Sequence, residues 1–203
     1  MVKLVLLHRR RTDGSPARAA ERLLGHHPAM RRCVVNVVER NPPDATALDG
    51  IDELSFDALA DARDLAGLLD GVDAYRTTEH VHKAPPAPPP TTGRSPGVKL
   101  VCPVVRRSGM SHAEFVTHWL DRHVPLALRH HPGLAKYVTN VVDEKLSASG
   151  PDLDGIAELH FPSPEALATA MYDSPDGERV IRADVARFIG HGVAYRVAEY
   201  VQK

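Results

Sequence analysis

An internal repeat constrains this chain more than any other feature of its sequence. Short segments near the start of the chain reappear, in the same order, after residue 97. The matched pairs are residues 2–5 and 98–101, 26–28 and 130–132, 35–38 and 139–142, 48–54 and 153–159, and 74–76 and 194–196. Two copies are too few for a solenoid, so the repeat indicates a duplicated domain.

A proline-rich stretch, residues 84–97, separates the two copies. Proline has no amide donor and fixes φ, so this stretch is predicted to be an extended, semi-rigid tether. Its position at the repeat boundary favours a spacer over a ligand for a proline-binding module. The predicted organisation is therefore a degenerate domain at 1–83, a linker at 84–97 and a better preserved domain at 98–203.

The second copy shows its helices and strands more clearly. Apolar, β-branched runs predict strands at 98–105, 137–142, 156–161 and 193–201. Ser111 and Glu114 have capping-box spacing, which predicts a helix from there to about residue 128. Pro164 opens a second helical region that ends near residue 188. This βαββαβ order predicts an α+β fold of two tandem ferredoxin-like domains, whose antiparallel sheets pack face to face.

The two copies differ in their helices. The spacing between matched segments makes the first helix of the N-terminal copy about two turns shorter. The missing part includes everything equivalent to Phe115, Trp119 and His123, which stand at i, i+4 and i+8 on one helix face. A histidine in such an aromatic wall can act as an acid or base near neutral pH. The alternative, which the pattern alone favours, is a core histidine bound to a backbone carbonyl.

The second copy resembles the EthD-like family of the dimeric α+β barrel superfamily over about residues 98–203. The resemblance rests on Val98-Lys99-Leu100-Val101, Phe115-x3-Trp119-x3-His123-Val124-Pro125-Leu126, Asp154-Gly155-Ile156-Ala157-Glu158-Leu159, Ser174-Pro175-x-Gly177 and Asp184-x3-Phe188. The aromatic–His–x–Pro segment is its specific part, and the first copy resembles the family only through its strands. Because members usually form homodimers whose sheets pack into a barrel, the resemblance implies an intramolecular dimeric α+β barrel, a fused pseudo-dimer with one half as scaffold. Whether this pair forms a further homodimer stays open.

The resemblance also implies a pocket between the sheet and the helices. By position it implies His123 as the general acid/base, with Phe115, Trp119, Tyr137, His160 and Phe188 around the substrate. Tyr137 has the alternative of capping the core with its hydroxyl in water. His160 alternates with Ile156 and Glu158 and has the alternative of facing the sheet–sheet interface.

The function that the resemblance implies is a cofactor-independent enzyme acting on a small apolar or aromatic, ketide-like substrate. The reaction would be a cyclisation, dehydration or isomerisation. The alternatives are a non-catalytic small-molecule binder, and a monooxygenase or haem protein of the same superfamily.

Composition excludes several other classes. The net charge of −1 shows no excess of basic residues of the kind that binds nucleic acid. The apolar N-terminal run is shorter than a signal peptide or membrane span requires, so neither is expected. Cys33 and Cys102 are too few for a disulfide framework or a zinc set. The twelve histidines lack companion ligands at metal spacing, so no metal is predicted. A cytoplasmic protein is expected.

Two charged positions match across the repeat. Glu53 corresponds to Glu158, and Arg76 corresponds to Arg196. Pairing across neighbouring strands predicts that both sets form structural ion pairs. A catalytic carboxylate at Glu158 is the less favoured alternative.

Overall fold

The computed structural model describes residues 1–9, 28–43, 45–68, 72–88 and 90–202. The N-terminal part contains β1 (Val2–Arg9), β2 (Met30–Arg40), β3 (Leu48–Phe56), α2 (Leu59–Leu68) and β4 (Val72–Lys83). A short strand, β5 (Gly93–Arg94), follows. The C-terminal part contains β6 (Val98–Arg106), α3 (His112–His118), η1 (Trp119–His123), α4 (Val124–His130), β7 (Lys136–Lys145), β8 (Gly155–Phe161), α5 (Pro164–Thr169), α6 (Pro175–Phe188), β9 (Ile189–Gly192) and β10 (Tyr195–Val201).

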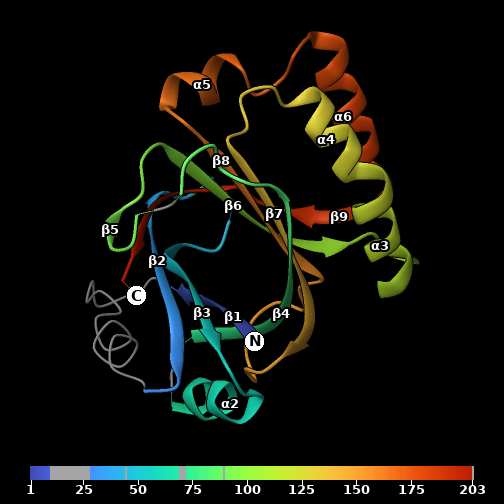
Figure 1. The fold of residues 1–203 in the computed structure, drawn as a ribbon. Coiled ribbons are helices and arrows are strands. Elements are labelled where there is room, and N and C mark those ends of the chain that lie inside the picture. Colours follow the sequence, from blue (N-terminus) through green and yellow to red (C-terminus); the bar gives the residue numbers. More distant parts are fainter. Residues whose placement is uncertain (10–27, 44, 69–71, 89, 203) are drawn as a thin grey trace.

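Eight antiparallel strands close into a barrel (Figure 1). The N-terminal strands lie in the order β2-β3-β1-β4 and the C-terminal strands in the order β7-β8-β6-β10. β4 pairs with β7 and β10 pairs with β2, so hydrogen bonds join the two sets at both edges. The closed antiparallel barrel confirms the expected α+β barrel architecture. The shortened first helix predicted for the N-terminal copy falls within 10–27, outside the described residues, so the βαββαβ order of that half is not established.

Alternation along the strands sorts side chains into an interior and two outer layers. On β1, Val5 and Leu7 point into the barrel, whereas Leu4 and Leu6 belong to an outer core with Ala62 of α2. The barrel interior combines residues of both halves, and a second outer core fills the space between β6–β8 and helices α3–α6. Figure 1 shows these helices on one side of the barrel and α2 on another.

The helical segment 112–130 begins where the sequence predicts. Ser111 accepts a hydrogen bond from the Glu114 amide, and the Glu114 carboxylate accepts one from the Ser111 amide, which confirms the capping box. A π-helical turn, η1, interrupts the segment at Trp119–His123. Phe115, Trp119 and His123 nevertheless remain buried on the same side. Their predicted common face is therefore confirmed.

Gly155 on β8 allows this helix to approach the sheet. A Cβ atom at Gly155 would lie 2.0 Å from Cζ3 of the Trp119 ring. The indole therefore packs directly on the strand backbone, and no larger residue fits without a shift. This contact fixes the position of the π-helical turn over the sheet.

The proline-rich segment is more than a spacer. β5 pairs with β10 through Gly93 and Arg94. The Ser95 amide then donates to the Glu199 carbonyl at 2.9 Å. The C-terminal end of the predicted linker is thus part of the sheet.

The last strand differs from its predicted bounds of 193–201. The structure has two strands in this region, of which β9 ends at Gly192 and β10 begins at Tyr195.

The described helices include none with the length and apolar character needed to cross a bilayer.

Candidate active site

A layer of charged side chains fills one end of the barrel interior. Lys3 on β1 contacts Glu53 at 2.9 Å, Glu79 at 2.5 Å and Glu158 at 3.0 Å. Lys99 on β6 contacts Glu158 at 2.9 Å and Glu199 at 2.8 Å, and it also pairs with Glu53. Burying so many charges is costly unless each one is paired, and here each ammonium is shared by three carboxylates.

Two asparagines complete this layer at corresponding positions. Asn36 Nδ2 donates to Glu53 at 3.0 Å and to the Ile51 carbonyl. Asn140 Nδ2 donates to Glu158 at 2.7 Å and to the Ile156 carbonyl. The two central carboxylates are therefore held by neutral donors as well as by lysines, which fixes their orientation.

The network keeps its members ionised. Burial disfavours the charged form of Lys99 most strongly, but Glu158, Glu53 and Glu199 outweigh it and raise the Lys99 pKa well above its usual value. Burial likewise opposes ionisation of Glu199, yet Lys99 lowers the Glu199 pKa from 4.5 to about 2. The layer is thus a fixed array of charges at neutral pH.

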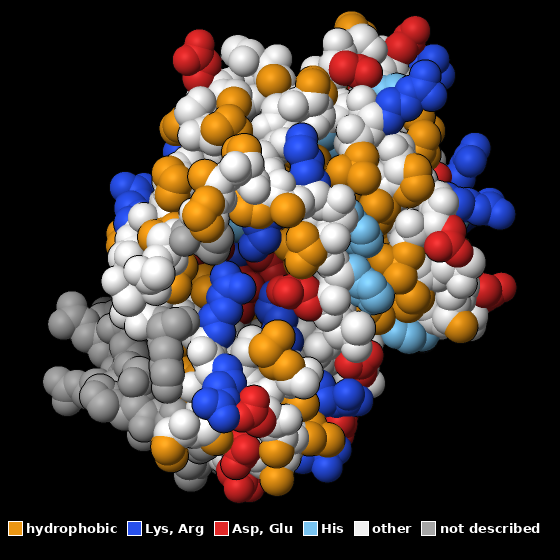
Figure 2. All heavy atoms as spheres, in the orientation of Figure 1, with side chains coloured by type: hydrophobic (Ala, Val, Ile, Leu, Met, Phe, Trp, Pro, Cys, Tyr) orange, Lys and Arg blue, Asp and Glu red, His pale blue; other side chains and the backbone are white. Residues whose placement is uncertain are grey.

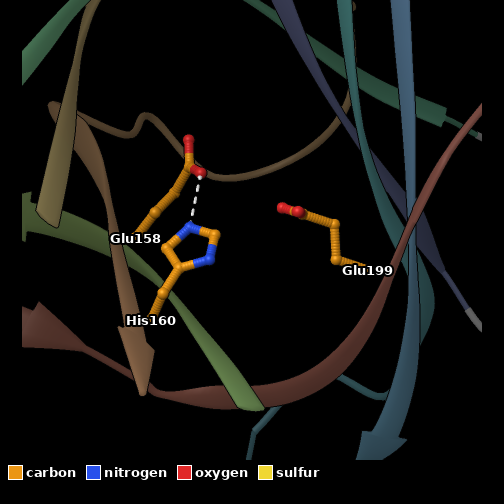
Figure 3. Close-up of side chains that lie close together, drawn as sticks. All are labelled: Glu158, His160 and Glu199. Carbon is orange, nitrogen blue, oxygen red and sulfur yellow. Dashed lines mark ion pairs between the residues drawn. The ribbon is translucent and has the colours of Figure 1, made fainter. Parts of the chain in front are cut away.

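His160 is the titratable ring of this layer. It lies two residues after Glu158 on β8, and its Nε2 is 3.5 Å from Glu158 Oε2. Figure 3 shows the two side chains pointing toward one another, with Glu199 reaching in from β10. Burial lowers the His160 pKa, while Glu158 acts in the opposite direction and Lys99 reinforces the lowering. The ring is therefore mainly neutral near pH 7.

A cavity of about 400 Å³ lies beside His160 at this mouth of the barrel. Its polar lining is His160, Glu79, Glu199, Ser95, Arg32 and Lys136, and its apolar lining includes Pro85, Pro86, Pro88, Pro90 and Pro96. Figure 2 shows a hollow in which basic and acidic side chains meet, surrounded by hydrophobic side chains. The cavity is therefore apolar on one side and charged on the other, as expected for a small-molecule site.

Ser95 ties the proline-rich wall to the charged layer. Its Oγ donates to Glu199 Oε1 at 2.6 Å, while Lys99 holds Glu199 Oε2 at 2.8 Å. The interpretation of residues 84–97 as only a spacer is thus incomplete, because the segment forms one wall of the cavity.

Three side chains here approach one another closely enough to hold a metal ion. One ligand atom each of Glu158, His160 and Glu199 lie within 4.8 Å of one another. The Lys99 ammonium, however, lies within 3 Å of both carboxylates and already occupies the cation position. These three side chains therefore do not fit a metal ion without displacement of Lys99.

Most of the residues predicted around His123 lie together, but outside the barrel interior. Phe115, Trp119, Tyr137 and Phe188 belong to the outer core between the sheet and the helices. His123 Nδ1 lies 3.0 Å from Asp184 Oδ2, and the ring packs against Phe188. His118 Nε2 lies 3.0 Å from the other oxygen of Asp184. The catalytic role of His123 stays a prediction, and its ring is 8% exposed.

Tyr137 stays with the aromatic residues of this outer core, whereas His160 lies apart from them. Tyr137 is buried, with its ring 5.4 Å from that of His82, so its hydroxyl does not reach water as the simpler alternative requires. His160 follows the other alternative and turns into the barrel with Glu158. The structure therefore brings Phe115, Trp119, His123 and Phe188 together, and it places His160 in a different cavity.

Sequence reasoning missed Lys3, Lys99, Glu79 and Glu199. The signal was present, because a lysine stands at the same place in two otherwise apolar, matched strand segments. Glu53 and Glu158 do form ion pairs, but with these lysines. Arg76 instead pairs with Asp143 and Glu144, and Arg196 pairs with Glu39.

The fold is similar to that of dimeric α+β barrel proteins, and residues 107–192 match the EthD domain family. This match covers the helices α3–α6 and most of the C-terminal strands. It agrees with the resemblance drawn from the sequence of the second copy. No curated protein matches the chain.

Solved structures with a similar fold share little sequence with the chain. An anthrone oxidase-like protein has a TM-score of 0.64 at 10% identity, over 99% of this chain and 93% of that one. A putative monooxygenase of Fusobacterium nucleatum has a TM-score of 0.54 at 10% identity, over 100% and 92%. A chlorite dismutase variant of Candidatus Nitrospira defluvii has a TM-score of 0.52 at 12% identity, over 97% and 90%. At such identities the comparisons establish the fold alone.

Proposed function

We propose that the chain is an enzyme that oxidises a small aromatic molecule carrying a phenolic or enolic hydroxyl. The substrate binds in the cavity at the charged mouth of the barrel, and His160 takes its proton. This differs from the expectation drawn from the family resemblance in both the base and the reaction, and it keeps the same class of substrate. A duplicated domain with a scaffold half remains part of the proposal.

The observation that carries this proposal is an asymmetry between the two halves. Lys3 pairs with Ser55 across β1 and β3, and Lys99 pairs with His160 across β6 and β8. Arg32 and Lys136 are the partners of the same two positions on β2 and β7. The halves therefore present matching charges around the cavity but different side chains at one position, Ser55 and His160. A purely structural layer gives no reason for a histidine on one side only.

His160 has the properties that a general base needs. A mainly neutral imidazole at pH 7 accepts a proton, and Glu158 at 3.5 Å stabilises the imidazolium that forms. Lys136, the neighbour of His160 on β7, and Arg32 both line the cavity and supply positive charge that favours the substrate anion. The proline wall excludes water from the aromatic part of the substrate.

The reaction type is drawn from the names of the structural neighbours. An anthrone oxidase-like protein and putative monooxygenases share the fold. A deprotonated phenol or enol is rich in electrons and reduces O2 directly. In such a reaction a CH2 group becomes C=O, one oxygen atom enters the product, and the other leaves as water. Proton removal is the step that the residues of this chain supply.

The test is oxygen consumption by the purified protein with anthrone and dihydroxynaphthalenes. His160→Ser makes the two halves alike and should lower kcat about 100- to 10,000-fold. His112→Asn, on the outer helix α3, is the matched control and should retain activity. A visible absorption spectrum of the same sample reports whether haem is bound.

Three results would overturn the proposal. They are full activity of His160→Ser, loss of activity in folded His123→Asn comparable to that in His160→Ser, and a haem spectrum. Tight binding of the aromatic compounds without turnover would favour the binding-protein alternative.

A further inference from the structure

The barrel has a second cavity at its other end. It has a volume of about 410 Å³ and is lined by Leu7, Leu48, Val105, Leu153 and Val193 among other residues. On β1, β6 and β10 its lining residues stand four or more positions from Lys3, Lys99 and Glu199. At about 3.3 Å per residue, the two cavities lie more than ~13 Å apart. The apolar layer with Val5, Ile51, Val101 and Ile156 separates them.

Most polar groups at this end are already satisfied within the protein. Tyr195 donates its hydroxyl to the Thr46 carbonyl at 2.8 Å, and Tyr75 donates to the Pro151 carbonyl at 2.8 Å. Asp73 accepts from Arg9 and from Ser149 Oγ. Gly150, with φ of +92°, lies against the Asp73 carboxylate, so the loop that closes this end has no room for a side chain there. These groups form a fixed rim and do not need a ligand.

The exposed His191 also lines this cavity. Arg9 is the other polar side chain of the rim with a donor left over. Its Nε and Nη2 donate to Asp73 at 2.8 and 2.7 Å. Within the part of the chain that the structure describes, no group accepts from its Nη1. Arg9 lines the cavity with a side chain that is 42% exposed, and Asp73 neutralises its guanidinium. A carboxylate ligand would be repelled by Asp73, whereas a neutral carbonyl oxygen would accept from Nη1 without that repulsion.

We propose that this cavity is a second ligand site, for a small neutral apolar molecule that carries one carbonyl oxygen. The apolar walls take the hydrocarbon part, and Arg9 Nη1 binds the oxygen. The proposal is independent of the activity proposed for the other mouth of the barrel. It gives the chain two small-molecule sites at the two ends of one barrel.

Three ligands of similar size separate the contributions of shape, acceptor and charge. Acetophenone has the carbonyl, ethylbenzene lacks it, and benzoate is the charged counterpart. Titrations followed by amide NMR shifts should give acetophenone about tenfold tighter binding than ethylbenzene, with benzoate weakest. The shifts should centre on Leu7, Leu48 and Val193.

Variants locate the site. Val193→Trp fills the cavity and should abolish acetophenone binding, whereas Ala135→Trp fills the cavity at the other mouth and should leave it unchanged. Arg9→Lys keeps the ion pair with Asp73 but lacks the Nη1 donor. The preference for acetophenone over ethylbenzene should therefore disappear. Circular dichroism confirms that each variant is folded.

Four results would overturn the proposal. Binding that survives in Val193→Trp, or shifts centred on His160 and Glu199, would move the ligand to the other cavity. Benzoate binding as tightly as acetophenone would remove the role of Asp73 and Arg9. Absence of binding by all three compounds would show that the cavity has no ligand of this class.

Discussion

Lys3 and Lys99 share the same two carboxylates across the axis of the barrel. Lys3 Nζ lies 2.9 Å from Glu53 and 3.0 Å from Glu158, and Lys99 Nζ lies 2.9 Å from Glu158 and also contacts Glu53. Each half contributes one lysine and one central glutamate. The charged layer is thus a joint product of the two halves, and its integrity should be sensitive to each lysine.

Replacing Lys99 with methionine should destabilise the protein by about 3–5 kcal/mol, because buried carboxylates of Glu158 and Glu199 lose their cation. Urea denaturation at pH 7 measures the change. Lys145→Met is the matched control, since Lys145 pairs with the exposed Asp152 and should cost less than about 1 kcal/mol. Equal effects of the two substitutions would contradict the structural role of the layer.

Acid should weaken the fold through Glu199. Its pKa is about 2 in the folded protein, against an ordinary value of 4.5. A lowered pKa means that its contribution is complete above pH 4.5 and is lost as the pH falls toward 2. The urea midpoint measured at pH 5, 4 and 3 should fall less steeply in Glu199→Gln than in the wild type. Parallel curves would show that Lys99 does not hold this carboxylate.

His123 should make a separate, milder contribution to pH dependence. Burial lowers its pKa below 6.5, although Asp184 opposes the shift. The unfolded chain therefore takes up this proton more readily, and stability should decrease as the pH falls below 6.5. NMR titration of the His123 ring should give a midpoint below that of a free histidine. A midpoint above 6.5 would mean that the ion pair with Asp184 dominates.

Gly155→Ala should destabilise the protein by about 1–3 kcal/mol, since the added methyl group overlaps the Trp119 ring. Thermal denaturation compares this variant with Trp119→Leu and with the double variant. Leucine is smaller than tryptophan, so adding Gly155→Ala to Trp119→Leu should leave the stability of the protein nearly unchanged. If the two effects simply add, Trp119 and Gly155 are not in contact.

The sequence predicted the elements of the C-terminal half well for identifiable reasons. The capping box of Ser111 and Glu114 and the proline at 164 are local signals that depend little on the rest of the fold. The pairings of β4 with β7 and of β10 with β2 have no comparable local signal in the sequence. Pairing between distant strands is set by the closure of the barrel, so the barrel was predicted through the family resemblance and not from local patterns.

The candidate site was harder to predict, because alternation along a strand does not say which face is functional. His160 lies beside Glu158 in the barrel, as the alternative drawn from strand alternation predicts, and not beside Trp119. The aromatic stripe predicts His123, which lies against Asp184 and Phe188 in the outer core. Lys3 and Lys99 carry no local signal that their charges are buried, because each stands alone in an apolar strand segment.

The two strand pairings between the halves, β4 with β7 and β10 with β2, determine what each half would expose if the chain were divided. Separated at the proline-rich segment, each half would expose the outer strands of an open four-stranded sheet, β2 and β4 in one half and β7 and β10 in the other. Such unpaired edge strands form backbone hydrogen bonds with strands of other chains and promote aggregation. Neither half should therefore be soluble when expressed alone, whereas coexpressed halves should reassemble into a stable heterodimer.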